Sequence, residues 1–309
     1  MPDVCVRLMS SAAIRARPTP DRIKIGSEAH KDLFCRLFTE SHQRFEPEQL
    51  PWPELDADAL ARLRGVPFWQ EVLHTELRAG RIVNAFAPTI ADKALREAVA
   101  LQGLEEARHA ELIRVMIRRY GIQVDEQPQA PLPDDIEKGF IDFGFGECLD
   151  SFLGFGAFKI ARQSQFLPEA VFEIFETLMY EETRHIVFFI NWMAWRESQK
   201  GRSAFVLRSA NSLRYYARAI GRLIGTIRRG QGVNDGKDFS ATQASVFLEG
   251  FTFRRFIEDC HTENLRRMSN FDQALLQPRF LPALADTALS ALRLWNSKAD
   301  AETVKPTPN

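Results

Sequence analysis

The chain has 309 residues, of which 45% are hydrophobic and 26% are charged, so a disordered chain is excluded and a sizeable core is expected. Its 40 basic and 41 acidic side chains leave a formal charge of -1, which excludes the strongly basic class of nucleic-acid-binding proteins. No apolar run approaches the ~18 residues that a transmembrane segment requires. The four cysteines form no Cys-x-x-Cys pair, which argues against a thiolate zinc site and a disulfide framework and favours a reduced, cytoplasmic setting.

Hydrophobic periodicity is helical along almost the whole chain, and the N-terminus, which lacks a clean signal peptide, is expected to be a loose arm. Ser27 is placed to cap the first helix, and Pro67 to begin the second. Thr89 with Asp92 resembles a capping box for the third, which Gly121 ends. The first helices expected in chain order span about 28–45, 67–87 and, from the capping box at Thr89 and Asp92, to about 120. Those that follow span about 134–163, 168–199, 203–229, a segment that begins after 240 and ends near 268, and 282–297.

Four consecutive helices are about 20 to 32 residues long, or roughly 30–48 Å at 1.5 Å per residue. They form two hairpins, joined by a proline-containing link of about a dozen residues that could run nearly the length of a bundle at ~3.3 Å per residue. We therefore expect an all-α fold, a four-helix bundle with one long crossover and additional C-terminal helices. The expected parts are an N-terminal arm with short helices (1–66), the bundle (67–199), C-terminal helices packed on it (200–297) and a disordered tail (298–309).

Two of the long helices carry the same short motif. One copy runs from Glu105 to His109 and the other from Glu181 to His185, and each contains Glu-x-x-His. A Glu and a His three residues apart project from one face of a helix, so a carboxylate oxygen and an imidazole nitrogen can reach the same metal ion. Apolar residues flank both pairs, and a carboxylate there would be penalised by desolvation unless it were paired or bound to metal. A single copy would favour a surface pair, but two copies facing one core predict a metal site.

The other two long helices must each supply a carboxylate if the site is to hold two metal ions. In the first, Glu76 lies on an apolar stripe, whereas Glu71 lies on a polar one. In the third, Glu147 is favoured, with Asp150 as the weaker rival. Oxygen and imidazole donors without thiolate suit iron or manganese and argue against structural zinc. The predicted ligands are Glu76, Glu106, His109, Glu147, Glu182 and His185.

This set resembles that of the ferritin-like di-iron carboxylate proteins, whose signature is Glu, Glu-x-x-His, Glu, Glu-x-x-His on four helices. The doubled Glu-x-x-Arg-His form is closest to their oxygen-activating branch, which includes bacterial multicomponent monooxygenases and acyl-carrier desaturases. The resemblance covers about residues 67–199 and implies a ferritin-like four-helix bundle, two bound iron ions (with Mn/Fe left open) and O₂ as co-substrate. It also implies that the acid before each ligand Glu and the Arg before each ligand His support the histidines, with two solvated i,i+3 ion pairs as the alternative. These supporting residues are Glu105, Arg108, Glu181 and Arg184, with Asp150 as a further one.

At two positions the chain departs from parts of that group. Ile113 stands where a radical tyrosine follows the first motif in ribonucleotide reductase small subunits, so a radical-storage role is not expected. Leu178 stands where arylamine N-oxygenases carry an extra ligand histidine, which weakens that substrate class without excluding N-oxidation.

The predicted helix 134–163 carries four glycines among phenylalanines, although a mid-helix glycine costs about 1 kcal/mol relative to alanine. Two interpretations stay open: room for a substrate beside an aromatic wall, or tight helix packing at small residues. The candidate pocket residues are Phe143, Gly144, Ser151 and Gly154.

From Lys200 to Arg229, arginines recur without an acidic residue, and four of them follow one helical stripe. This stripe could dock an acidic redox protein, an acidic acyl carrier or an anionic membrane surface. The alternative is a solvated face or contact with the acidic segment of the 40s and 50s. The stripe consists of Arg214, Arg218, Arg222 and Arg229.

The sequence contains no dinucleotide-binding glycine motif after a strand and no iron–sulfur cysteine spacing, so we expect a separate ferredoxin-like or flavin reductase to deliver electrons. The predicted function is a di-iron oxygenase or oxidase that hydroxylates, desaturates or N-oxidises an apolar small molecule. The alternatives are a ferroxidase or peroxide-scavenging protein that handles iron without an organic substrate, and a metal-free scaffold. A homodimer is one of the assemblies left open. Outside the motifs, His30, His42, His74 and His261 are expected at the surface or in satisfied structural roles.

Overall fold

The computed structural model describes residues 23–125, 127–201, 212–222, 224–225 and 252–303. In these ranges the regular secondary structure is entirely helical, which confirms the predicted all-α fold. None of the helices described is both long enough and apolar enough to cross a membrane.

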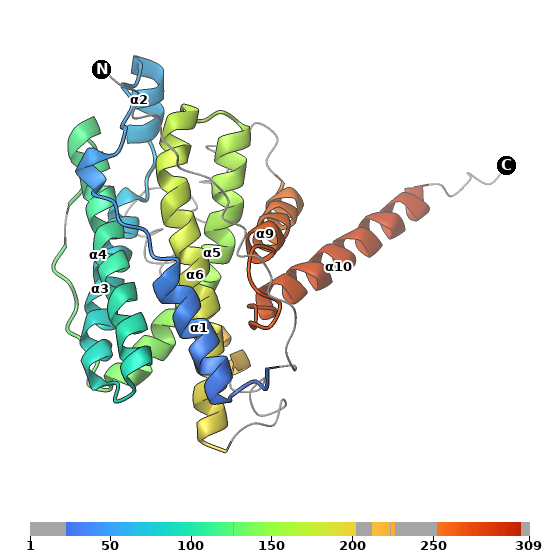
Figure 1. Cartoon of the computed structure of the whole chain (residues 1–309). Helices are drawn as coiled ribbons and strands as arrows, with labels where there is room; N and C mark the ends of the chain where they lie inside the picture. The colour runs from blue at the N-terminus through green and yellow to red at the C-terminus, as the bar shows by residue number, and fades with distance from the viewer. Residues whose placement is uncertain (1–22, 126, 202–211, 223, 226–251, 304–309) are drawn as a thin grey trace.

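Four long helices form the central bundle (Figure 1). α3 lies beside α4 and α5, and α6 lies beside α5 and α4, so the four helices close a ring. The connection between α4 and α5 runs along the side of the bundle, as a long crossover requires (Figure 1). The bounds are Trp69–Phe86 for α3, Lys93–Tyr120 for α4, Ile136–Gln163 for α5 and Glu169–Gln199 for α6.

Two helix ends follow directly from local chemistry. The Ser27 hydroxyl accepts a hydrogen bond from the His30 backbone N–H at 3.2 Å and so caps α1 (Glu28–Glu40). Gly121 ends α4 in the left-handed conformation, at φ 59°, where a residue with a Cβ would be strained. Both caps are as predicted.

Three other expected ends are wrong by a few residues. Asp92 caps α4 through its side chain without Thr89, which lies in the short 3-10 turn after α3. Pro67 lies before the first turn of α3 and does not begin it. α1 ends at Glu40 rather than Phe45, because the chain turns there toward the motifs of α4 and α6.

Elements outside the bundle differ more from expectation. α2 (Ala57–Arg64) is not among the predicted helices, although Asp56 caps it. α9 (Phe253–Met268) ends where expected, and the earlier part of that prediction lies outside the described residues. α10 (Phe280–Thr303) continues past residue 297, so the first part of the expected disordered tail is helical. The predicted helix 203–229 is helical at 212–222 and 224–225, and its remainder lies outside the described residues.

The additional helices cover particular faces of the bundle. α1 packs against α4 and α6, α9 covers α5, and α10 packs against α9 and extends away from the body (Figure 1). α1 therefore lies over the two helices that carry the repeated motif.

A polar layer divides the bundle core in two. Along α4, one apolar cluster has its last buried residue at Val99 and the other begins at Ala110. Along α6, the corresponding residues are Leu178 and Ile186. Buried glutamates and histidines fill the space between the clusters. Because burying polar groups costs free energy, such a layer indicates a function rather than a contribution to stability.

Two glycines of α5 lie at close helix contacts. A Cβ on Gly144 would overlap the Phe189 ring, and a Cβ on Gly156 would lie 2.8 Å from Cys260 Cα of α9. Gly154 has no such neighbour within 4 Å. The packing interpretation therefore holds for Gly144, which is corrected from a pocket residue to a contact residue, whereas Gly154 stays a pocket candidate.

We expect Gly144→Ala to lower the free energy of unfolding by about 1–3 kcal/mol, because the buried Phe189 ring cannot accept another methyl group without overpacking. Gly154→Ala is the matched control: it adds the same methyl group where space is open and should raise the stability by up to ~1 kcal/mol through helix propensity. Chemical denaturation measures both variants, and equal effects would contradict this difference in packing.

Asn191 joins three parts of the chain from a fully buried position on α6. Its Oδ1 accepts hydrogen bonds from His30 Nε2 of α1 at 2.9 Å and from the Leu276 backbone N–H at 2.8 Å. Its Nδ2 donates to the carbonyl oxygens of Val187 and Leu276 at 2.7 and 2.9 Å. One amide thereby ties α1 and the turn after α9 to the bundle.

Asn191→Ala would leave these buried groups unpaired, at about 1–3 kcal/mol each, so we expect the free energy of unfolding to fall by about 2–4 kcal/mol. Asn84→Ala, which removes an exposed amide, should cost less than ~1 kcal/mol. Urea unfolding followed by circular dichroism tests the pair, and a loss no greater for Asn191→Ala than for Asn84→Ala would show that the network does not hold α1.

Candidate metal centre

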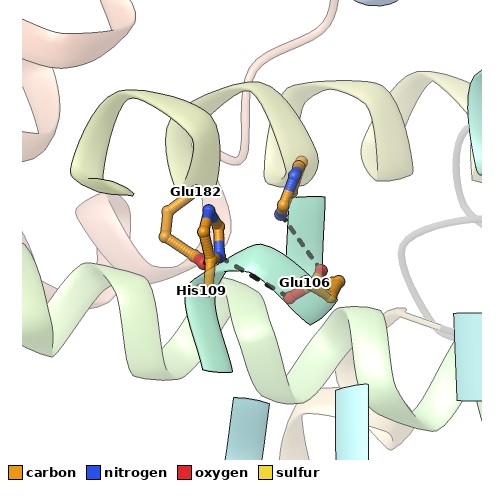
Figure 2. A group of neighbouring side chains, drawn as sticks. Glu106, His109 and Glu182 are labelled. Atoms are coloured by element: carbon orange, nitrogen blue, oxygen red, sulfur yellow. Dashed lines mark ion pairs between the residues drawn. The ribbon is translucent and has the colours of Figure 1, made fainter. Parts of the chain in front are cut away.

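The polar layer has its centre on α4 and α6. Glu106 and His109 lie on α4, Glu182 and His185 lie on α6, and all four are buried. One potential ligand atom of each residue lies within 4.8 Å of those of the other three. Figure 2 shows Glu106, His109 and Glu182 directed toward one another. This group can hold a metal ion, because carboxylate oxygens and imidazole nitrogens converge at one place.

Three carboxylates from three helices face Nδ1 of His109. That atom lies 3.0 Å from Glu182 Oε1, 3.5 Å from Glu76 Oε2 and 3.8 Å from Glu106 Oε2. Glu76 comes from α3 of the same hairpin and Glu182 from α6 of the other, so both hairpins contribute carboxylates around His109.

His185 occupies an equivalent position in the other half of the cluster. Its Nδ1 lies 3.1 Å from Glu106 Oε1 and 3.1 Å from Glu147 Oε1 of α5. The two imidazole rings are 5.5 Å apart between centroids, and Glu106 turns one oxygen toward each. The cluster therefore has two halves, each with its own imidazole, joined by Glu106.

The structure brings together all six residues proposed as ligands, and the two rival acids, Glu71 and Asp150, are more exposed than the chosen ones. Glu71 is exposed and lines a surface pocket with His74. Asp150 is exposed as well, whereas Glu147 is buried beside His185. The periodicity argument thus selects the inward-facing carboxylate on both α3 and α5.

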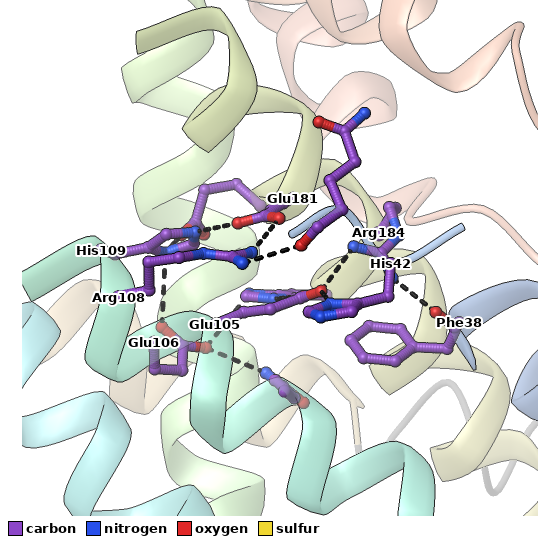
Figure 3. Close-up of polar contacts among 12 residues, drawn as sticks. Phe38, His42, Glu105, Glu106, Arg108, His109, Glu181 and Arg184 are labelled. Carbon is purple, nitrogen blue, oxygen red and sulfur yellow. Dashed lines mark hydrogen bonds and ion pairs between the residues drawn. The ribbon is translucent and has the colours of Figure 1, made fainter. Parts of the chain in front are cut away.

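The outer nitrogen of each histidine binds an acid of the opposite helix (Figure 3). His109 Nε2 of α4 lies 2.9 Å from Glu181 Oε2 of α6, and His185 Nε2 of α6 lies 2.8 Å from Glu105 Oε2 of α4. Each acid also binds an arginine from across the interface, Arg108 with Glu181 and Arg184 with Glu105. The supporting pairs are therefore buried and crossed between helices, and the alternative of two solvated i,i+3 pairs is wrong.

This arrangement determines which nitrogen of each ring faces the cluster. Because the outer acids accept the Nε2–H groups, Nδ1 of both His109 and His185 is directed to the inner carboxylates. Burial would raise the pKa of Glu105, but the hydrogen bond from His185 and the positive charges of His185 and Arg184 hold that pKa well below its usual value. Glu105 is thus an ionised acceptor.

The inner residues have perturbed pKa values. Burial alone would lower the pKa of His109 and His185, but the surrounding carboxylates raise both well above the usual value. Burial, with the charge of Glu182, raises the pKa of Glu76 to about 7, and burial with the charge of Glu106 raises that of Glu147. Without a cation, the cluster therefore holds protons against its own negative charge.

Two inward atoms test whether the residues suit a bound cation. Oε2 of Glu147 is buried and has no hydrogen-bond partner, and Nδ1 of His109, although 3.0 Å from Glu182 Oε1, makes no hydrogen bond of good geometry. Buried polar atoms are normally hydrogen-bonded, so unpaired lone pairs at this place are the chemistry that a metal ion would satisfy. The residues present are suited to a metal.

His42 is the member of this site that the sequence does not reveal. It lies just after α1, and its Nδ1 is 2.6 Å from Glu105 Oε1. Of the two expected roles, surface or satisfied structural histidine, the structure gives His42 the second, with the ligand-supporting Glu105 as its partner. No motif at fixed spacing links His42 to a glutamate more than sixty residues away, so only the packing of α1 could have revealed the contact.

His42, Glu105 and Glu181 form a second group with ligand atoms in mutual reach. Arg184 and Arg108 already bind the two carboxylates. A cation would meet two guanidinium groups there, so electrostatics favour a supporting role for this group and a metal role for the inner one.

Two other pocket candidates, Ser151 and Phe143, lie on α5, and Ser151 is the one beside the cluster. Ser151 Oγ lies 3.4 Å from Glu182 Oε2. Phe143 is half-buried and packs near Phe140, with ring centroids 6.3 Å apart. Ser151 and the open position at Gly154 are one turn apart on α5.

The arginine stripe is partly engaged within the chain. Arg218 binds Asp142 Oδ1 at 2.7 Å, and Arg222 binds the Asp142 carbonyl oxygen at 2.6 Å. Arg214 is exposed, and Arg229 lies outside the described residues. The expected contact of the stripe with the acidic segment of residues 40–59 is not seen for Arg218. Its acidic partner is Asp142 of α5.

Comparisons of the chain with protein-family models, curated proteins and solved structures found no match. The resemblance to the di-iron carboxylate proteins therefore rests on the repeated motif and on the buried cluster.

Glu106→Gln would keep the size of this side chain while removing the charge shared by the two halves. We expect this variant to bind less than half the metal that the wild type binds, measured by elemental analysis after anaerobic Fe²⁺ loading and removal of free metal. Glu71→Gln, at an exposed position on α3, should load like the wild type. Full loading of the Glu106 variant would contradict the ligand assignment.

Proposed function

We propose that this chain is a non-haem dinuclear-iron oxidoreductase that uses O₂ to oxidise an apolar small molecule. The observation that carries the proposal is a buried layer in which two imidazoles, each with a carboxylate of its own, share Glu106. The donors are oxygen and imidazole nitrogen without thiolate, a combination that suits iron and manganese.

Two ions account for the layer better than one. Nδ1 of His109 and Nδ1 of His185 face separate carboxylates, Glu76 and Glu147, while Glu106 offers one oxygen to each side. The six residues with neutral imidazoles carry four negative charges, which two divalent ions would balance. With a single ion, the other half of the cluster would have to keep protons to offset its remaining negative charge.

When bound, a pair of ferrous ions would supply two electrons to O₂. The chain's own residues orient and isolate that chemistry. Glu105 and Glu181 hold the imidazoles in one orientation, and the apolar clusters above and below the layer keep water away.

We place the substrate approach at Glu76 and Glu182, the ligand residues whose side chains are least buried. The side chains of both histidines are fully buried, whereas those of Glu182 and Glu76 are 12% and 14% exposed. The cluster is thus closed on the side of α1 and more open at Glu76 and Glu182. Ser151, beside Glu182, and the open position at Gly154 lie along this approach.

Each turnover would need electrons from outside the chain. We assign the delivery of these electrons to a separate ferredoxin-like or flavin reductase. An acidic carrier protein would be a second partner, attracted to the same arginines. Among the described arginines of the stripe, the exposed Arg214 is the one most free to meet such a partner, because Arg218 and Arg222 contact Asp142.

The test is a single turnover of the wild-type protein loaded anaerobically with Fe²⁺. We expect about two ions per chain, oxidation of both by about one O₂, and no second turnover until a reductant is added. Glu106→Gln serves as the inactive control and Glu71→Gln as the active one. Loading of one ion or none would contradict the proposal, and continued oxidation of many irons per chain would instead assign the protein to the ferroxidases.

A further inference from the structure

We propose that the segment of residues 38–45, the end of α1 and the loop after it, is part of the metal centre, and that His42 is the positioning residue for His185. The segment lies outside the bundle and outside both motifs. This inference rests on the proposed metal binding, but it concerns a residue and a segment to which that proposal gives no role.

Arg184 connects the segment to Glu105 through three separate hydrogen bonds. Its Nη1 donates to Glu105 Oε1 at 2.9 Å, its Nε to Ser41 Oγ at 2.8 Å and its Nη2 to the Phe38 carbonyl oxygen at 2.6 Å. The guanidinium group also lies 4.5 Å from the centre of the Phe38 ring (Figure 3). Arg184 is fully buried, so its charge is held by the segment on one side and by Glu105 on the other.

Arg108 is held by the same segment in a similar way. Its Nη1 donates to the Gln43 carbonyl oxygen at 2.7 Å, and its guanidinium group lies 4.0 Å from the centre of the Phe45 ring. Nη2 of Arg108 donates to Glu181 Oε1. One short stretch of chain therefore fixes both arginines that support the two crossed acids.

His42 adds a contact to one half of the site. Nδ1 of His42 is 2.6 Å from Glu105 Oε1, while Glu105 Oε2 accepts from His185 Nε2 at 2.8 Å. Arg184 Nη1 donates to the same Oε1, so His42 and Arg184 together fix the rotation of the Glu105 carboxylate, and the His185 ring is directed with Nδ1 toward the cluster. Loss of His42 should therefore loosen the His185 half more than the His109 half.

The first experiment is a titration of metal-free protein with Co²⁺ alone, followed by cobalt absorption and calorimetry. In His42→Ala we expect one of two ions to bind ~10–100-fold more weakly, the range usual for a lost partner of a ligand histidine, while the other ion is bound as in the wild type. His42→Gln, whose amide can still donate to Glu105, should recover part of the loss. Arg36→Ala is the matched control, because Arg36 is exposed on α1 before the segment and donates to the Asp32 carbonyl oxygen of its own helix.

The second experiment needs no metal and separates this inference from the proposed function. In ¹⁵N–¹H spectra of the metal-free imidazoles, we expect the Nε2–H signal of His185 to be sharp and slow to exchange in the wild type and broadened in His42→Ala, with His109 unchanged. If the wild type binds no Co²⁺, the proposed function fails, while this spectrum still decides the role of His42. An unchanged His185 signal in His42→Ala would overturn the inference. In the titration, so would binding of both ions as in the wild type, or equal weakening of both, because equal weakening would indicate a general structural effect.

Discussion

Negative charge buried at one level of a helical bundle is the constraint on which the rest of this structure depends. Carboxylates at that depth are tolerated only when they are protonated, paired or bound to a cation. The chain uses arginines for the two outer acids, Glu105 and Glu181, whereas the inner four meet two imidazoles and the neutral side chains of Gln102 and Ser151. This imbalance is what distinguishes a site for metal from a structural ion-pair network.

The crossed contacts make the site a property of the assembled bundle rather than of either hairpin. Glu105 of α4 orients His185 of α6, and Glu181 of α6 orients His109 of α4, so neither histidine is correctly held until the two helices meet. α1 then closes the outer side through Arg184 and its neighbours. Glu76 of α3 and Glu182 of α6 are slightly exposed, whereas both histidine side chains are fully buried.

Sequence periodicity predicted the parts of the site that depend on single helices. Glu76 and Glu147 could be chosen over their neighbours because the 3.6-residue repeat assigns each position to a face before any packing is known. Contacts between distant segments could not be predicted in this way. His42 meets Glu105 only because α1 packs where it does, and Gly144 proves to be a contact for Phe189 because of how α6 lies against α5. The crossing of the two acids likewise depends on the relative rotation of α4 and α6, which spacing along one helix does not encode.

The most direct test of the central claim is diffraction from crystals grown with Fe²⁺ and recorded on both sides of the iron absorption edge. The account predicts two anomalous peaks a few ångströms apart in the polar layer, one next to Nδ1 of His109 and the other next to Nδ1 of His185, with Glu106 between them. A single peak among His42, Glu105 and Glu181, or no peak in the bundle at all, would contradict it.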